Sequence, residues 1–285
     1  MFQLLKENRI TPSRALGQNF VADANTVRRV ARLAGVGPGD RVVEVGAGLG
    51  SLTLALADTG AEVIAVERDR RLVPVLRRVL AEKAPAAPVT VIEADAMALD
   101  WPALLVPPGG WALVANLPYN VATPLVADLL DLVPAFDRMV VMVQREVADR
   151  LVAGPGDDAY GAVSVKVAYW AEAKLLGTVP SSVFVPSPRV SSALVGLRRR
   201  PVPAVLPSAV APEDLFRLVR TGFAQRRKML RRALAGLAVP AETFAQAGVD
   251  AESRAEELSV LDWGRLAVAI GACAEPPRAG TDQTA

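Results

Sequence analysis

The chain has 285 residues, 52% of them hydrophobic, with 32 basic side chains, 30 acidic side chains, one cysteine and no histidine. This composition suits a sizeable domain plus a smaller one, and it excludes an internal disulfide, ordinary zinc sites and every histidine-dependent triad. No run of about 18 uncharged apolar residues and no signal or transit peptide pattern is present, so we expect a cytoplasmic protein with no membrane-bound part. The scarcity of cysteine and histidine leads us to expect no bound metal.

A glycine-rich loop follows the first apolar run. Residues 42–45 predict a strand, residues 52–57 predict a helix, and Gly46, Gly48 and Gly50 lie between them. A dinucleotide fingerprint would need glycine at the position of Ser51. Small loop residues let the backbone approach a ligand, and Glu44 before the loop suits an amino-acid or ribose group better than a pyrophosphate. The loop therefore favours S-adenosylmethionine.

Two further predicted strands also end in acids. Glu67 closes the run 62–67, and Asp95 follows the run 89–94. Open α/β sheets bind ligands at the carboxyl ends of their strands, so Glu67 is placed to hold the ribose hydroxyls and Asp95 to meet the adenine amine of the cofactor. Each acid alone is explained as well by a helix N-cap or a solvated loop. Their order along the chain, together with the glycine loop, favours the cofactor site.

The tetrapeptide Asn116-Leu117-Pro118-Tyr119 follows a strand predicted over 111–115. An amide, a free carbonyl and an aromatic face are what an exocyclic amine on a flat base requires. In isolation the pattern is equally good turn chemistry. Beside a cofactor site it predicts an adenine-amine methyltransferase, with Asn116 and the Leu117 carbonyl accepting the amine hydrogens and Tyr119 stacking on the extruded base.

Later segments predict three more strands, over 138–144, 174–179 and 193–198. The last of these should pair antiparallel, because the preceding linker is too short for a helical crossover. We therefore predict an α/β fold with a mostly parallel sheet and an antiparallel edge strand, over residues 1–200. A proline-containing linker follows, and we expect a small helical domain over 201–271 and a disordered tail over 272–285.

Positive charge is concentrated between residues 186 and 240, where eleven basic side chains oppose two acids. Such a run is as often a solvated helix face as a binding surface. Next to a base-methylating site it predicts contacts with RNA phosphates.

Three motifs carry a family resemblance over about residues 10 to 235. They are Leu-Gly-Gln-Asn-Phe at 16–20, Phe-Val-Pro-Ser-Pro-Arg-Val-Ser-Ser at 184–192 and Arg-Arg-Lys-Met-Leu-Arg at 226–231. With the glycine loop and the Asn116 tetrapeptide, they resemble the class I S-adenosylmethionine-dependent methyltransferases and, within them, the rRNA adenine N6,N6-dimethyltransferases. The second and third motifs resemble the small-subunit branch of that family. Ala47 departs from the pattern, since the family often carries proline there.

The resemblance implies a Rossmann-like class I fold, S-adenosylmethionine as cofactor, and 16S rRNA or the immature small ribosomal subunit as partner of a monomeric enzyme. It implies catalytic roles for Asn116, Leu117, Tyr119 and Phe184. The cofactor-binding residues it implies are Asn19, Val21, Gly46, Glu67, Asp95 and Asn116. The RNA-binding residues it implies are Arg226, Arg227, Lys228 and Arg231.

Other functions remain open on the sequence. A 23S rRNA adenine methyltransferase conferring macrolide resistance would share the first half of these motifs. A ribosome-assembly factor could keep the fold without the reaction, although intact Asn116, Tyr119 and Glu67 argue against it. A DNA adenine methyltransferase would need a larger reading domain than the region after the linker, and a small-molecule methyltransferase would not need the basic stretch.

Overall fold

A computed structural model describes residues 2–13, 16–105 and 110–274 of the chain. The chain forms two compact units, the first over Met1–Val152 and Ala171–Arg200 and the second over Ala153–Trp170 and from Pro201 onward. The expected first domain, 1–200, contains a segment that the structure assigns to the second unit. Residues 153–170 belong there because Val165 and Tyr169 are buried in the core of that unit.

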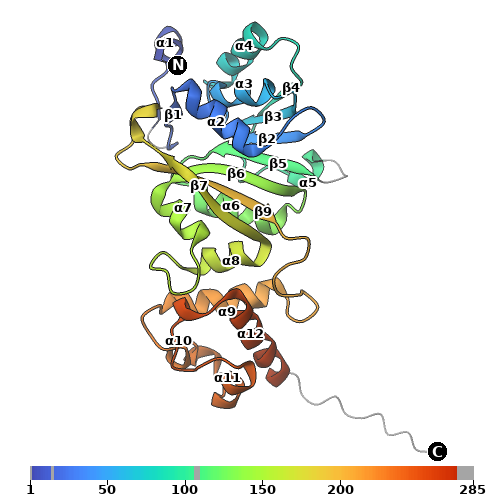
Figure 1. The fold of residues 1–285 in the computed structure, drawn as a ribbon, viewed down its shortest axis with the longest axis vertical. Helices are drawn as coiled ribbons and strands as arrows, with labels where there is room; N and C mark the ends of the chain where they lie inside the picture. The colour runs from blue at the N-terminus through green and yellow to red at the C-terminus, as the bar shows by residue number, and fades with distance from the viewer. Residues whose placement is uncertain (1, 14–15, 106–109, 275–285) are drawn as a thin grey trace, which may run out of the picture. The chain divides into compact units, whose positions relative to one another are not determined.

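The first unit is built on one seven-stranded sheet (Figure 1). In spatial order its strands are β4 (Val89–Glu93), β3 (Glu62–Glu67), β2 (Arg41–Val45), β5 (Trp111–Asn116), β6 (Phe136–Gln144), β9 (Ser192–Arg199) and β7 (Ala171–Val179). Strands β4 to β6 are parallel, and β9 runs antiparallel to both β6 and β7. The predicted mostly parallel sheet with an antiparallel edge is confirmed.

Helices cover the sheet, which explains why its central strands β3, β2 and β5 are apolar without alternation. They are α2 (Ala24–Ala34), α3 (Ser51–Ala57), α4 (Val73–Lys83), α5 (Trp101–Leu104), α6 (Ala122–Leu132) and α7 (Arg145–Val152). Val30 and Leu56, from α2 and α3, pack in one cluster with Val42 and Val114 of the central strands. This burial holds the strand ends, and the loops that follow them, in fixed positions.

A second, two-stranded sheet joins the chain's first motif to a later one. Strand β1 (Phe20–Val21) pairs antiparallel with β8 (Phe184–Val185). Helix α1 (Phe2–Glu7) precedes β1, and a 3-10 turn (Ser181–Val183) precedes β8. Neither strand was predicted, since two residues are too few to show a periodicity.

The second unit is helical. Its helices are α8 (Ala162–Trp170), α9 (Pro212–Ala224), α10 (Leu230–Ala233), α11 (Ala241–Ala247) and α12 (Val260–Ala274), with 3-10 turns over Ala235–Leu237 and Ala255–Glu257. Trp263 is fully buried in its core with Phe216 and Tyr169. Helix α12 continues past the expected boundary at 271, and residues 275–285 of the expected tail lie outside the described residues. None of the described helices is long and apolar enough to span a bilayer.

Candidate active site

A pocket lies at the carboxyl ends of the central strands of the first unit. The space in it, counted out to open solvent, is about 830 Å³. Most of its lining comes from five stretches of chain, within residues 16–20, 45–48, 66–68, 94–97 and 116–121. Seven predicted site residues meet there, namely Asn19, Gly46, Glu67, Asp95, Asn116, Leu117 and Tyr119.

The glycine loop is tied to the neighbouring strand. The N–H groups of Gly46 and Ala47 donate to the Val66 carbonyl at 2.9 and 3.2 Å. Gly48 has a φ of +59°, and a Cβ there would lie 3.0 Å from the Phe20 ring. A side chain at this position would therefore meet both backbone strain and a steric clash. Because Gly46 and Gly48 have no side chains, the loop backbone at these two positions is open to the pocket.

Glu67 lies buried at the end of β3, with 6% of its surface exposed. Its Oε2 accepts from the Gly48 N–H and its Oε1 from the Asp69 N–H, both at 2.8 Å. Burial raises the pKa of Glu67, and the two N–H groups oppose that rise. Each carboxylate oxygen keeps a further lone pair, so the group can still accept from a pair of hydroxyls.

Asp95 sits at the exposed rim of the pocket. Its Oδ2 pairs with Nη1 of Arg68 at 3.1 Å, and its Oδ1 accepts from the Met97 N–H at 3.0 Å. The Arg68 side chain is half exposed, so its contact with Asp95 is open to solvent. An amine donor can therefore reach the carboxylate without displacing a buried partner.

The acceptor turn begins at Asn116, whose Nδ2 donates to the carbonyl oxygen of Asn19 at 2.9 Å. Leu117 is buried and its N–H donates to the Met142 carbonyl at 3.0 Å, which anchors the turn to β6. The Tyr119 hydroxyl lies 2.8 Å from Oγ of Ser192. This contact fixes the Tyr119 side chain at the pocket wall, and partial burial raises the pKa of Tyr119.

Two predicted site residues lie away from this pocket. Phe184 is 2% exposed and packs in the core with Val27 and Leu194. Val21 is also buried there, and it lines a small cavity behind the glycine loop. The catalytic role expected for Phe184, in which its ring would stack on the target base, does not fit this position, because the apolar ring gains more from the core than from a polar rim. A stacking role would require the ring to leave the core.

Glu44 lines the same small cavity as Val21. It is 2% exposed, and burial raises its pKa to about 8. Within the described part of the chain its Oε2 has no hydrogen-bond partner. A carboxyl group in this state is protonated at neutral pH, so it offers an O–H donor as well as an acceptor.

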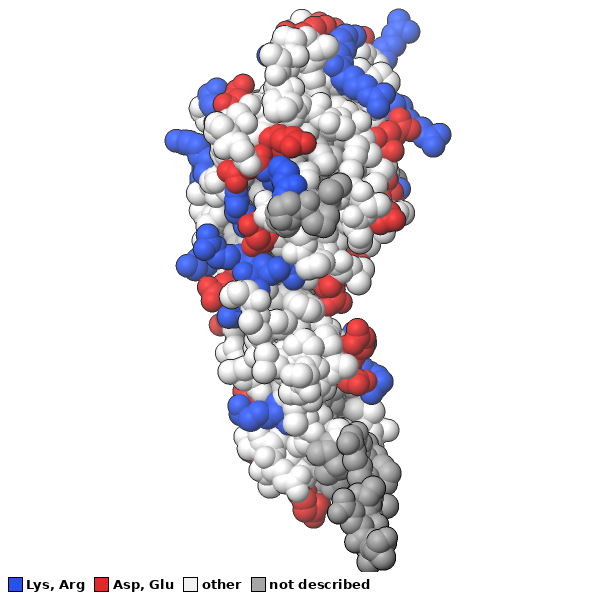
Figure 2. Space-filling view, turned by 90° about the vertical axis from the view of Figure 1, so that its right-hand side faces the viewer, with Lys and Arg blue, Asp and Glu red and all other residues white. Residues whose placement is uncertain are grey.

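The predicted RNA-contacting residues of the second unit differ in their surroundings. Nε of Arg226 pairs with Glu256 at 2.5 Å, and its Nη2 donates to the Asp158 carbonyl at 2.7 Å. Arg231 pairs with Glu252 at 3.3 Å. Arg227 and Lys228 are exposed. On the face drawn in Figure 2, basic and acidic side chains are interspersed and do not form one broad basic patch. Attraction of RNA phosphates to this face would therefore depend on local groups of cations.

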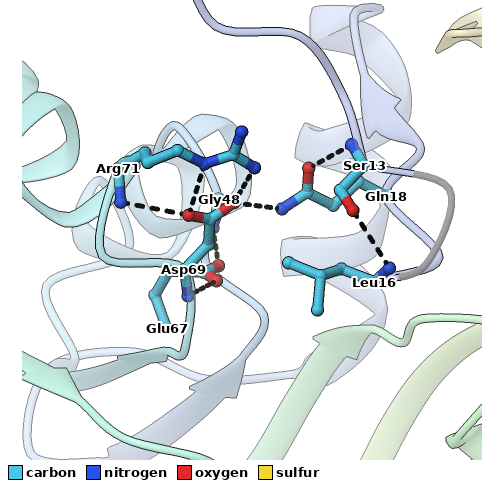
Figure 3. Close-up of polar contacts among 7 residues, drawn as sticks. All are labelled: Ser13, Leu16, Gln18, Gly48, Glu67, Asp69 and Arg71. Carbon is cyan, nitrogen blue, oxygen red and sulfur yellow. Dashed lines mark hydrogen bonds and ion pairs between the residues drawn. The ribbon is translucent and has the colours of Figure 1, made fainter.

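Three residues near the pocket, Gln18, Asp69 and Ser192, have no predicted role. Gln18 and Asp69 are hydrogen-bonded to each other beside the pocket (Figure 3). Ser192 is the partner of Tyr119. All three stand within the quoted motifs or strand ends, but their partners are distant in sequence and no local pattern reveals such pairs. No group of metal-ligating side chains occurs among the residues that the structure describes.

The chain is similar to known proteins over most of its length. Residues 11–270 match the family model described as ribosomal RNA adenine dimethylase. The chain is 51% identical to the ribosomal RNA small subunit methyltransferase A of Thermobifida fusca, over 90% of each chain. It is 44% identical to the protein of that name from Magnetococcus marinus, over 93% of this chain and 94% of the relative.

Two solved structures share the fold. A dimethyladenosine transferase from Plasmodium falciparum has a TM-score of 0.72 and 23% identity, over 87% of this chain and 95% of its own. The 23S rRNA methyltransferase ErmE has a TM-score of 0.69 and 27% identity, over 89% of this chain and 100% of its own. The predicted class I methyltransferase fold is confirmed.

Proposed function

The chain belongs to the ribosomal RNA adenine dimethylase family, and from that premise we propose that it dimethylates the exocyclic amines of adenosines in small-subunit 16S rRNA with S-adenosylmethionine. The relatives that share about half of its residues are named as small-subunit methyltransferases. The observation that carries the proposal is the meeting of Glu67 and Asn116 in one pocket.

The cofactor half of the pocket fits S-adenosylmethionine. When bound, this cofactor supplies an electrophilic methyl group. Glu67 would accept the ribose hydroxyls with its remaining lone pairs, and Asp95 at the rim would accept from the adenine amine. The open backbone at Gly46 and the main chain at Asn19 would enclose the rest. Buried Glu67 supports this fit, because its two bound N–H groups fix the carboxyl group in the pocket and leave lone pairs for a polyol ligand.

The other half of the pocket would hold the target base. An adenine must leave its stack to reach the pocket, at a cost of a few kcal/mol. The Tyr119 ring would offset part of this cost, since stacking on an aromatic contributes about 1–3 kcal/mol per base. Oδ1 of Asn116 and the Leu117 carbonyl would accept the two amine hydrogens. This draws the nitrogen toward tetrahedral geometry, and its lone pair then points at the methyl group. No histidine is required for such a transfer.

RNA binding would involve the exposed cations Arg227 and Lys228 in the second unit. Phosphate contacts of this kind weaken as salt rises, with a slope set by the number of contacts. We also predict a monomeric state and a cytoplasmic location, and light scattering of the purified protein tests the first.

The test incubates the purified protein with labelled S-adenosylmethionine and unmethylated small ribosomal subunits, with large-subunit RNA as control. Chromatography of the digested nucleosides should yield dimethyladenosine from the small subunit alone. Label only on the large-subunit RNA would instead assign the resistance-type activity, to which the likeness to ErmE gives some support. Label on neither RNA would overturn the proposal and would favour a ribosome-assembly factor that binds RNA without methylating it.

A further inference from the structure

We propose that Gln18 and Asp69 are positioning residues that orient the Asn116 amide through the backbone of residues 16–21, here called the N-terminal segment. This inference rests on the proposed function, because it assigns to Asn116 the acceptance of the target amine. It adds a physical link between the cofactor side of the pocket and the acceptor side.

The direction of the Asn116 amide is decided by its partner. A backbone carbonyl can only accept, so the amide atom 2.9 Å from the Asn19 oxygen must be the nitrogen. Fixing Nδ2 on one side of the amide carbon fixes Oδ1 on the other. The oxygen that would accept the adenine hydrogen is therefore aimed by the position of the Asn19 carbonyl.

The residue next to Asn19 holds that carbonyl in place. Nε2 of Gln18 donates to Oδ2 of Asp69 at 2.8 Å, and its Oε1 accepts from the Ser13 N–H at 2.7 Å (Figure 3). The Gln18 N–H also donates to the Ser13 carbonyl at 3.1 Å. Both ends of one amide side chain are thus engaged, which leaves the backbone at this point little freedom.

Asp69 is a firm anchor for this contact. Its side chain is 5% exposed, and Arg71 binds it with Nε on Oδ1 at 3.0 Å and Nη2 on Oδ2 at 2.7 Å. The Asp69 N–H donates to Oε1 of Glu67, whose other oxygen holds Gly48. The anchor therefore belongs to the same hydrogen-bonded group as the expected ribose-binding carboxylate.

A second contact of the N-terminal segment supports the arrangement independently. Gly17 has a φ of +64°, and a Cβ there would lie 2.8 Å from Oδ1 of Asn120 and 3.3 Å from Cβ of Pro118. The segment's backbone therefore lies directly against the acceptor turn. Displacement of Gln18 from Asp69 would shift this contact as well as the Asn19 carbonyl.

Charge explains why position 18 requires a neutral donor. Arg71 lowers the pKa of Asp69 to about 2, so Asp69 is an anion at any working pH. An amide donates to that anion, whereas an ionised glutamate at position 18 would repel it. Gln18→Glu should therefore break the contact at neutral pH and restore it on protonation at lower pH.

The chain provides a matched control in Gln3, whose Nε2 donates to Oε1 of Glu7 at 2.7 Å on the exposed surface. Gln3→Glu creates the same pair of carboxylates in the same part of the chain, away from the pocket lining. We would measure kcat and KM for rRNA methylation from pH 4.5 to pH 8.5, a range that reaches the ordinary pKa of glutamate, for the wild type, Gln18→Glu, Gln18→Ala and Gln3→Glu.

Gln18→Glu should lose on the order of 10- to 100-fold in kcat at the alkaline end, since a displacement of about 1 Å has effects of that size. The ratio to wild type should recover as the pH falls, while Gln18→Ala should show a loss that is constant with pH. Gln3→Glu should follow the wild type throughout. A loss without pH recovery in Gln18→Glu, or an unchanged kcat in both position-18 variants, would overturn the inference.

A readout independent of activity separates this inference from the proposed function. The side-chain NH₂ resonance of Asn116, assigned by its disappearance in Asn116→Asp, should shift in Gln18→Ala and stay unchanged in Gln3→Ala. If the wild type fails to methylate any RNA but this shift occurs, the proposed function fails and the structural link stands. If the wild type is active and the resonance does not move, the link is wrong.

Discussion

Nδ2 of Asn116 donates to the carbonyl oxygen of Asn19 at 2.9 Å, which joins two motifs that stand far apart in the chain. This contact brings the expected acceptor of the target amine against the segment that encloses the pocket. It also makes the amide of Asn116 directional, because only one of its two polar atoms can face a carbonyl.

Tyr119 should act through its ring. Tyr119→Ala should lower kcat/KM for rRNA by roughly 5- to 150-fold, the equivalent of about 1–3 kcal/mol of lost stacking. Tyr119→Phe combined with Ser192→Ala should stay close to wild type, because it keeps the ring and removes both partners of the partly buried hydroxyl pair. Steady-state kinetics on small subunits would check this. Equal losses in both variants would show that the hydroxyl, and not the ring, is needed.

Phe184 should contribute more to the stability of the fold than to the rate of methylation. Phe184→Ala should lower the free energy of unfolding by about 3–5 kcal/mol, as expected for a core aromatic, while Phe184→Leu should cost less than about 1.5 kcal/mol. Denaturant unfolding measures both. If folded Phe184→Leu protein loses more than tenfold in kcat, the ring leaves the core and contacts the base.

Substitution of Arg226 should affect stability, whereas substitution of Arg227 and Lys228 should affect RNA binding. Its contacts with Glu256 and the Asp158 carbonyl predict that Arg226→Ala destabilises the second unit, by about 1 kcal/mol for a partly exposed pair. Arg227→Ala with Lys228→Ala should leave the melting temperature unchanged and weaken RNA binding. The slope of log K against log salt should fall by roughly 0.7–0.9 for each phosphate that the variant no longer neutralises. An unchanged slope would remove these two residues from the RNA interface.

Glu44 should make stability depend on pH. Its pKa is raised by burial to about 8 in the folded protein, against an ordinary value of 4.5. Between these values the folded state holds a proton that the unfolded state has lost. Stability should therefore fall as pH rises, by up to about 1.4 kcal/mol per pH unit, and level off above pH 8. Glu44→Gln should remove this slope in denaturant unfolding curves from pH 5 to 8. Parallel curves for the two proteins would contradict a protonated Glu44.

The parallel strands of the seven-stranded sheet and much of the pocket could be predicted, since buried parallel strands are continuous apolar runs and each ends at the ligand-binding edge of the sheet. Glu67, Asp95 and Asn116 were found in this way. The Gln18–Asp69 contact spans 51 residues, and nothing local to either residue reveals it.

Other features depend on packing that the sequence does not display. The apolar Phe184 is compatible with a stacking face or with the core, and only the pairing of β8 with β1 decides between them. Residues 153–170, which end in helix α8, carry no local pattern that assigns them to one unit. Burial of Tyr169 against Phe216, with ring centroids 5.1 Å apart, assigns them to the second.

The most direct test of the account compares Asn116→Ala with the wild type in two measurements on the same protein. Calorimetry gives the affinity for S-adenosylmethionine, and nucleoside chromatography gives the rate of dimethyladenosine formation on small subunits. We predict an affinity within about threefold of wild type and a rate lowered by about 10²- to 10³-fold, as for the loss of one group that acts in the transition state. Dimethyladenosine formation at the wild-type rate would contradict the account.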